Sequence, residues 1–454
     1  MRNGRPRTLF DFLLILGDLL LVNSAFILAF LIRFKGRLPA ANFDPYVKLF
    51  PWISLVAVAF FNLYGLYYTV RRNWRDLLSS LICSVGLIFL SGVVLSYMTR
   101  AFAFPRTVFF LAALLQLLFL GVWRRFMWRL ERKLHGSKKV VIVGTLPEAQ
   151  ELAGKLSRSS EGVFGVQGLI VSSQERQQPD PYPLLGRWET ADRDLLEHSP
   201  DLVYICSSVP QEFKKKIIAF SLSSPWEVYL VPDLYDILVV QASLDQIDDT
   251  PVFHVGSVRP GNGLQFGKRL LDVALSAVGL VLASPIMLLI SLAVKLDSPG
   301  PVFYTQERIS YRGQTFKLIK FRTMIKDAEK HSGPVLAAEN DPRITRVGKF
   351  LRATRLDELP QLINVLKGEM SLVGPRPERP YFVQQFEKEI PEYSYRHIVK
   401  SGITGLAQVA GKYSTSPKDK LRFDLLYARK ASLLLDLQIL FQTLKVLFTK
   451  GKNL

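Results

Sequence analysis

Four long apolar segments fill the first third of the chain and constrain its fold more than any other feature. Each contains roughly the 20 residues that a helix needs to cross a lipid bilayer. The sequence therefore predicts a bundle of four transmembrane helices within residues 1–135. The segments are Leu9 to Ile32, Val47 to Tyr68, Leu77 to Met98 and Phe104 to Trp123.

Basic residues are distributed unevenly around these segments. Arginines and lysines gather after the second and fourth segments, which by the positive-inside rule places both termini in the cytoplasm. Four basic residues in the loop after the first segment oppose this orientation. We expect a protein of an inner (cytoplasmic) membrane whose other domains face the cytoplasm. The supporting residues are Arg71, Arg72, Arg75, Arg124, Arg125, Arg129, Arg132 and Lys133, and the opposing ones are Arg33, Lys35, Arg37 and Lys48.

The overall composition agrees with a membrane protein. The 454-residue chain has 49% hydrophobic residues and a formal net charge of +19. This combination suits a protein that faces anionic lipid headgroups and phosphate-bearing substrates. A nucleic-acid-binding protein can share the charge but would not also carry four long apolar segments. We therefore expect the lipid bilayer, and no nucleic acid, as a partner.

Strand-like and helical runs alternate in residues 136–256, which predicts a Rossmann-like cytoplasmic module. The G-x-G-x-x-G spacing of a dinucleotide site is absent, because Gly144 is followed by Thr145, Leu146 and Pro147. We expect the module to serve packing, regulation or dimerisation, with a homodimer as the corresponding assembly. The runs are Val140 to Gly144, Pro147 to Leu156, Leu202 to Cys206 and Val228 to Val231.

A further apolar run, at about residues 268–296, is long enough to cross the membrane but is interrupted by Ser284 and Pro285. Proline lacks an amide hydrogen and clashes with the carbonyl four residues earlier, so the helix bends there. Ser284 can satisfy a carbonyl that the break releases. Basic residues lie at both ends, including Lys268 and Lys295, and both ends therefore favour the cytoplasm. A re-entrant helix pair fits better than a fifth straight span with a proline kink.

An acidic pair, Asp357 and Glu358, lies among basic residues in the last predicted unit, residues 257–454. Apolar spacing predicts a short helix from about Glu358 to Lys367, with Asp357 as its N-cap. A lone acidic pair would only cap this helix and complement its dipole. Here the cations exceed what a cap requires, whereas a diphosphate substrate would need them. They are Arg352, Arg355, Arg376, Lys317, Lys320 and Arg322.

Several ordered motifs in this unit carry a specific resemblance. They are SPGPVFYTQERIS, FKLIKFRTM, DPRITRVGKFLRATRLDELPQLINVLKGEMSLVGPRPE and SGITGLAQVAGK. They resemble the catalytic domain of the polyprenyl-phosphate hexose-1-phosphate transferases, the large monotopic phosphoglycosyl transferases of exopolysaccharide and O-antigen synthesis. The resemblance is close from about Phe266 to the C-terminus and looser before it. One departure is Ser401, which stands where the family usually has proline before the glycine.

This resemblance implies a membrane protein of the α and α/β class. Its parts would be a four-helix transmembrane bundle, a Rossmann-like α/β cytoplasmic module, and a monotopic catalytic domain with a re-entrant membrane helix.

The resemblance also implies a reaction. A UDP-sugar, most often of glucose or galactose, would give its hexose-1-phosphate to undecaprenyl phosphate and release UMP. Asp357 would be the nucleophile and hold the sugar phosphate covalently, which divides the transfer into two steps. Glu358 would bind Mg²⁺ or assist proton transfer, and Asp357 is a second candidate ligand of the metal. The expected phosphate-binding set is Arg352, Arg376, Arg322 and Arg355, with Pro375 and Pro377 holding Arg376.

Two other functions remain open. The four spans and the Rossmann-like module also suit a membrane-anchored nucleotide-sugar epimerase or dehydratase. Such an enzyme needs a glycine fingerprint and a Tyr-x-x-x-Lys pair, but Tyr311 is followed four residues later by Thr315. The second alternative is a non-enzymatic scaffold for glycan assembly, against which the acidic pair and its arginines argue. Asp424 and Tyr427 lie in a further matching stretch, and the sequence assigns them no role.

Overall fold

The computed structural model describes residues 9–67, 73–100, 104–159, 162–172, 181–239, 243–255, 261–326, 328, 341–412 and 415–447. Tyr68, Arg71 and Arg72 lie outside these ranges. The chain divides into two compact units, Met1–Pro232 and Asp233–Leu454, and each is described by itself.

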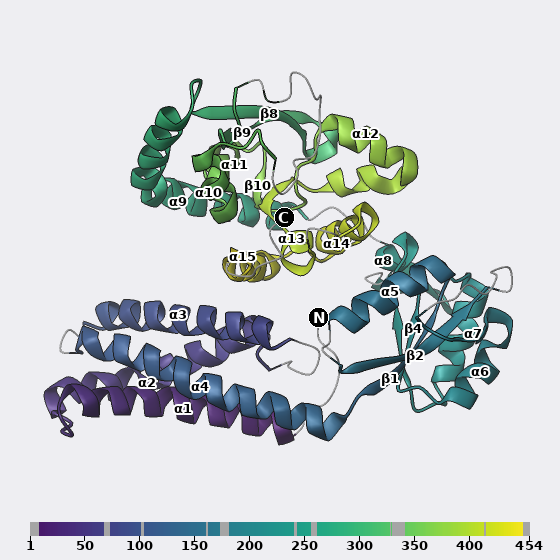
Figure 1. Ribbon diagram of the computed structural model, residues 1–454, viewed down its shortest axis with the longest axis horizontal. Coiled ribbons are helices and arrows are strands. Elements are labelled where there is room, and N and C mark those ends of the chain that lie inside the picture. The colour runs from purple at the N-terminus through teal and green to yellow at the C-terminus, as the bar shows by residue number, and fades with distance from the viewer. Residues whose placement is uncertain are drawn as a thin grey trace. The chain divides into compact units, whose positions relative to one another are not determined.

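Each of the four apolar segments forms a helix in the first unit (Figure 1). All four are long and apolar enough to cross a membrane, and they pack around one cluster of buried side chains that includes Phe26, Ile53 and Val85. The second helix differs from the prediction at both bounds: it begins at Ala40 and ends at Leu63, because the chain turns at Tyr64. The fourth helix continues past Trp123, because its buried face extends to Trp128. The helices are α1 (Leu9–Arg33), α2 (Ala40–Leu63), α3 (Trp74–Met98) and α4 (Arg106–His135).

A buried ion pair joins α1 to α4. The Arg124 guanidinium pairs with the Asp18 carboxylate and also donates to the carbonyl of Leu66, in the turn after α2. The same guanidinium lies 5.8 Å from the ring centre of Phe61 and 5.2 Å from that of Tyr67. One cation therefore connects three helices, and burying it is tolerable only because these partners surround it.

The rest of the first unit is a parallel sheet with helices on both faces, in the strand order β3-β2-β1-β4-β5. Side chains alternate across β1, so Val140 and Ile142 face α5 while Val141 and Val143 face α6 and α7 (Figure 1). This arrangement confirms the predicted α/β module. The elements are β1 (Lys138–Val143), α5 (Leu146–Ser159), β2 (Phe164–Val171), β3 (Leu184–Arg187), α6 (Ala191–His198), β4 (Leu202–Ile205), α7 (Gln211–Ser221) and β5 (Glu227–Leu230).

The second unit begins at Asp233, before the domain boundary near residue 256 that the sequence predicts. The physical reason lies in α8 (Leu234–Val239), where Ile237 is buried against Val383, Tyr393 and Leu425. An antiparallel hairpin of β6 (Ser243–Ile247) and β7 (Thr250–His254) follows.

The elements that position the site are the hairpin β8 (Phe303–Ile309) and β9 (Thr315–Phe321), the helices α10 (Arg346–Thr354) and α11 (Gln361–Lys367), and the strand pair β10 (Ser371–Val373) and β11 (Gly402–Thr404). The remaining helices are α12 (Pro380–Glu389), α13 (Leu406–Ala410), α14 (Pro417–Lys430) and α15 (Leu433–Leu447).

Helix α9 (Asn262–Asp297) is the fifth helix, among the described residues, that is long and apolar enough to span a membrane. Its hydrogen-bonded ribbon continues through Pro285 but bends along its length (Figure 1). Pro285 cannot donate to the carbonyl of Val281, and the Ser284 hydroxyl donates to that carbonyl instead, at 2.8 Å. The compensation expected of Ser284 is therefore confirmed.

We expect Arg124→Leu to lower the free energy of unfolding by about 3 kcal/mol or more, because Asp18 would keep a buried charge without a partner. Thermal unfolding of the detergent-purified protein measures the change. Arg129→Leu, at an exposed position of the same helix, is the matched control and should unfold as the wild type does. Equal unfolding temperatures for the two variants would contradict a stabilising role for the pair.

Candidate active site

The acidic pair lies in a separate turn between two helices. Helix α10 ends where Arg355 adopts a left-handed conformation with a φ of 60°, and Leu356–Glu358 form one 3-10 turn. Pro360 has no amide hydrogen to donate, and α11 begins only at Gln361. The predicted helix start at Glu358 and the N-cap role of Asp357 are therefore wrong.

Three cations surround the carboxylate of Glu358, which is buried. Its Oε1 lies 2.8 Å from Nη2 of Arg376, 3.2 Å from Nζ of Lys320 and 3.7 Å from Nη1 of Arg355. Burial alone would raise the pKa of Glu358, but these three cations outweigh burial and hold its pKa well below the usual range. Glu358 is therefore ionised and fixed in place.

Asp357 has the opposite environment, although it is the adjacent residue. Its carboxylate is buried, and Oδ1 has no hydrogen-bond partner within the described residues. Burial raises the pKa of Asp357, while Lys320 opposes that rise. Neighbouring carboxyl groups with opposed environments are suited to different chemical roles. Oδ1 of Asp357 is thus not committed to any partner among the described residues, whereas Glu358 is committed to its cations.

The backbone of Arg376 is held on both sides. Its carbonyl accepts a hydrogen bond from Nη2 of Arg396, at 3.0 Å, and Arg396 forms a buried ion pair with Asp424, at 2.7 Å. The carbonyl of the preceding Pro375 accepts from the amide of Gly402, at 2.8 Å. Asp424, to which the sequence assigned no role, thus positions Arg376 through Arg396.

A second buried network holds the end of β10, which leads into this turn. Nζ of Lys268 and the hydroxyl of Tyr427 both donate to the carbonyl of Val373, at 2.9 and 3.1 Å. Both also bond the Asp436 carboxylate, at 2.6 and 2.7 Å. Tyr427 therefore helps to fix the strand that carries the GPRPE turn.

The other predicted residues occupy two kinds of position. Arg352 lies half-buried on α10, and its side chain makes no hydrogen bond or ion pair with the described residues. Arg322 is buried and donates to the carbonyls of Ser298 and Pro299, at 2.7 Å each, just after α9. Arg322 thus holds the end of α9 and makes no ion pair with the acidic pair. Pro375 and Pro377 flank Arg376 and are both buried.

Lys320 and Lys317 could not be ranked from the sequence, but they differ in the fold. Lys320 is half-buried at the acidic pair, where burial lowers the pKa of its ammonium, while Lys317 is exposed. The two lysines are three positions apart on β9, and an odd separation places two side chains on opposite faces of a strand, as observed here.

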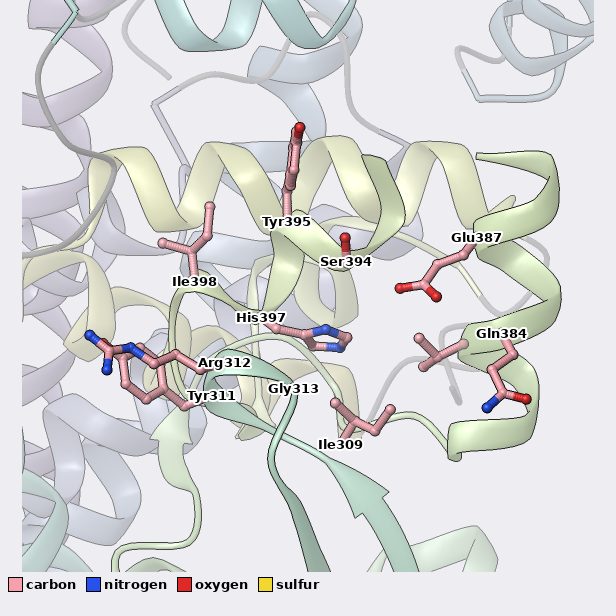
Figure 2. A pocket seen from close by; sticks show the side chains of 11 residues that line it. Ile309, Tyr311, Arg312, Gly313, Gln384, Glu387, Ser394, Tyr395, His397 and Ile398 are labelled. Atoms are coloured by element: carbon pink, nitrogen blue, oxygen red, sulfur yellow. The ribbon is translucent and has the colours of Figure 1, made fainter. Parts of the chain in front are cut away.

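Several cavities lie in the second unit near these elements, among them the following two. The first, of ≈ 260 Å³, is lined by Arg355, Glu358 and Arg376 together with apolar side chains. The second, of ≈ 410 Å³, lies between the turn after β8 and helix α12, and Figure 2 shows His397 among its lining residues. Burial, together with Arg396, lowers the pKa of His397 to about 4. None of the predicted site residues lines this second cavity.

Comparison with known proteins relates the chain to one family. A sequence model described as bacterial sugar transferase matches residues 264–450. A UDP-glucose:undecaprenyl-phosphate glucose-1-phosphate transferase from Xanthomonas campestris pv. campestris is 33% identical over 461 residues, covering 95% of this chain and 92% of that protein. A protein of the same name from Escherichia coli (strain K12) is 35% identical over 321 residues, covering 68% of each.

Another relative differs in its sugar. A UDP-N-acetylgalactosamine-undecaprenyl-phosphate N-acetylgalactosaminephosphotransferase from Aeromonas hydrophila is 41% identical over 225 residues. That match spans 49% of this chain and 52% of the relative, so the chain matches about half the length of that protein.

We expect Glu358→Gln to destabilise the protein by about 3 kcal/mol or more at neutral pH, because three cations lose their shared anion. The folded-state pKa of Glu358 lies below its unfolded value of about 4.3, so this stabilisation is present above that pH and is lost as the pH falls. The difference in the free energy of unfolding between the variant and the wild type should therefore be smaller at about pH 3 than at neutral pH. Thermal unfolding at both pH values measures it.

The matched control for this experiment is Glu307→Gln, at an exposed position of β8. It should not change stability at either pH. If the stability difference between Glu358→Gln and the wild type did not change with pH, the lowered pKa of Glu358 would be contradicted.

Proposed function

Since the chain belongs to the bacterial sugar transferase family, we propose that it transfers a sugar-1-phosphate from a UDP-sugar to undecaprenyl phosphate, releasing UMP. The product would be an undecaprenyl diphosphate sugar, an early intermediate of exopolysaccharide or O-antigen synthesis. The observation that carries the proposal is the acidic pair. One carboxylate, Glu358, is fixed by three cations, and Oδ1 of the adjacent Asp357 is buried without a hydrogen-bond partner within the described residues.

The proposed reaction has two steps through one covalent intermediate. Oδ1 of Asp357 attacks the β-phosphorus of the UDP-sugar, and the bond from that phosphorus to the bridging oxygen breaks. The electron pair leaves with UMP, and the sugar phosphate remains on Asp357 as an acyl phosphate. An oxygen of undecaprenyl phosphate then attacks the same phosphorus, and the bond to Asp357 breaks, which restores the carboxylate.

The cations provide electrostatic stabilisation for both steps. Arg376 and Arg355 line the cavity beside Glu358 and can donate to phosphate oxygens, which guanidinium groups bind with two parallel hydrogen bonds. Glu358 keeps these cations in position before a substrate arrives, so no reorganisation is needed during the reaction. The guanidinium of Arg352, which makes no hydrogen bond or ion pair with the described residues, is a further candidate for a phosphate.

The acidic pair also fits the Mg²⁺ that the family implies. No group of three or more potential ligands occurs within the described residues. Mg²⁺ usually takes only one or two carboxylates and completes its coordination with water and substrate phosphates. The adjacent carboxylates of Asp357 and Glu358 would supply that contribution. When bound, the ion would neutralise charge on the diphosphate.

An epimerase or dehydratase is the less well supported alternative. Its cofactor would bind in the first unit, where the strand order reverses between β1 and β4. At that position the Glu148 carboxylate accepts hydrogen bonds from the Ser207 hydroxyl, at 2.6 Å, and the Ser208 amide, at 3.0 Å. An acidic side chain there repels the pyrophosphate of a dinucleotide, which argues against a bound nicotinamide cofactor.

Asp357→Asn should abolish UMP release and sugar-phosphate transfer, because an amide cannot form the acyl phosphate. The assay measures UMP from a panel of UDP-sugars with Mg²⁺, with and without undecaprenyl phosphate, and the sugar that supports release identifies the donor. Wild type alone should also exchange labelled UMP into the UDP-sugar without acceptor. Full activity of Asp357→Asn would refute the nucleophile, and no release from any UDP-sugar by wild type would refute the function.

The second unit would lie on the cytoplasmic side of the membrane, with α9 re-entering it. Both ends of α9 are tied to the same unit. Near its start, Oδ1 of Asp272 accepts from the amide of Leu372, at 3.0 Å, and at its end, Oδ2 of Asp297 accepts from the amide of Val347, at 3.1 Å. Between them, Val281 and other apolar side chains are exposed. A straight span would place the two ends on opposite sides of the bilayer, so these ties support re-entry.

Single cysteines test this arrangement. They are placed at Asn262 and Pro299, which are exposed at the two ends of α9, after both native cysteines are changed to serine. A membrane-impermeant maleimide should label both in inverted inner-membrane vesicles and neither in spheroplasts. Arg37→Cys, in the loop after α1, should be labelled in spheroplasts and serves as the control. Labelling of only one end of α9 from the outside would refute re-entry.

A further inference from the structure

The cavity of ≈ 260 Å³ beside the acidic pair has two kinds of wall. One side is charged and consists of Arg355, Glu358 and Arg376. The volume is below the range of about 300–1,000 Å³ that is usual for sites enclosing a whole drug-sized ligand. The cavity is therefore suited to one part of a substrate. The apolar wall consists of Leu356, Leu359, Leu362, Ile403, Val409 and Val446.

The polar groups in the remaining wall are mostly committed within the protein. The hydroxyls of Thr404 and Thr443 lie 2.7 Å apart, and that of Thr443 donates to the carbonyl of Ile439. The Gln408 amide donates to the carbonyl of Ile403, and its Oε1 is buried without a hydrogen-bond partner in the described parts of the chain. A sugar bound here would leave most of its hydroxyls unsatisfied, which costs affinity, whereas a hydrocarbon chain would not.

The cavity adjoins the most apolar exterior of the unit. Leu362, in its wall, lies close to Gly279 in the middle of α9, where an added Cβ would lie 3.4 Å from Cδ1 of Leu362. The neighbouring Val281 of α9 is 72% exposed. Phe350 of α10 and Leu444 of α15, two helices that also contribute to the wall, are 61% and 42% exposed. The cavity thus connects a lipid-compatible surface to the cationic site.

We propose that this cavity is the acceptor subsite, in which Arg355 and Arg376 bind the phosphate of a polyprenyl phosphate and the apolar wall binds its first isoprene units. The inference rests on the proposed function and adds to it where the lipid enters. A phosphate monoester on a hydrocarbon chain matches both walls, because its charge meets the guanidinium groups and its chain meets Leu, Ile and Val side chains.

Ala353 provides the test, because it lines the cavity from an exposed position on α10 and a larger side chain there need not disturb the core. Ala353→Trp should raise the KM for undecaprenyl phosphate about tenfold, the loss expected when two methylene groups lose their apolar contacts. The KM for the UDP-sugar and the exchange of UMP into it should stay unchanged, because Arg355 and Arg376, which serve the donor and the acceptor in turn, are both retained and only the apolar part of the cavity is filled. Ala410→Trp, at an exposed alanine outside the cavity, is the matched control and should match wild type.

Two outcomes would overturn the subsite. One is that Ala353→Trp equals Ala410→Trp in every measurement. The other is that Ala353→Trp impairs UMP exchange and the KM for the UDP-sugar instead, which would assign the cavity to the donor. A second measurement is independent of turnover. A diazirine-bearing farnesyl phosphate should crosslink to Ile403 or Val446 in the wild-type protein, in competition with undecaprenyl phosphate. If no crosslink formed in the cavity, the subsite would be refuted. This result does not depend on whether the protein catalyses the proposed transfer.

Discussion

The second unit is organised around one buried interaction, the ion pair between Glu358 and Arg376. A carboxylate removed from water is tolerable only when it is paired and hydrogen-bonded. Glu358 satisfies this requirement with cations from three places in the sequence, Lys320 on β9, Arg355 after α10 and Arg376 after β10. These segments must therefore meet at one point. The buried pair of Arg396 and Asp424 then fixes the backbone of Arg376 itself.

Helix α9 depends on the same unit at both of its ends. Nζ of Lys268 bonds the Asp436 carboxylate and the carbonyl of Val373 near the start, and Arg322 binds the carbonyls of Ser298 and Pro299 just past the end. Arg322, which the sequence suggested as a phosphate ligand, thus holds the end of the apolar helix α9. Because the same unit fixes β10 and α9, the site stays close to the apolar surface that α9 presents.

Much of this could be predicted from the sequence, because local patterns determine it. Hydrophobic length predicted the long helices, strand periodicity predicted the α/β module, and the Ser284 and Pro285 pair predicted which carbonyl needs a donor. The start of α11 was missed because the left-handed Arg355 ends α10 and creates a separate turn. The roles of Asp424 and Arg322 were missed because their partners lie far away in the sequence, and residue type alone does not identify such partners.

Charge balance explains why the two carboxylates need opposed environments. With Glu358 ionised, the three cations around it leave a net positive site, which suits a diphosphate and opposes the rise that burial causes in the pKa of Asp357. A bound diphosphate adds negative charge next to Asp357, and this raises its pKa further, toward the neutral form that cannot attack phosphorus. A divalent cation on the diphosphate would offset that added charge. The Mg²⁺ that we propose would therefore help to keep the proposed nucleophile ionised in a buried site, because the protein's own cations are already shared with Glu358.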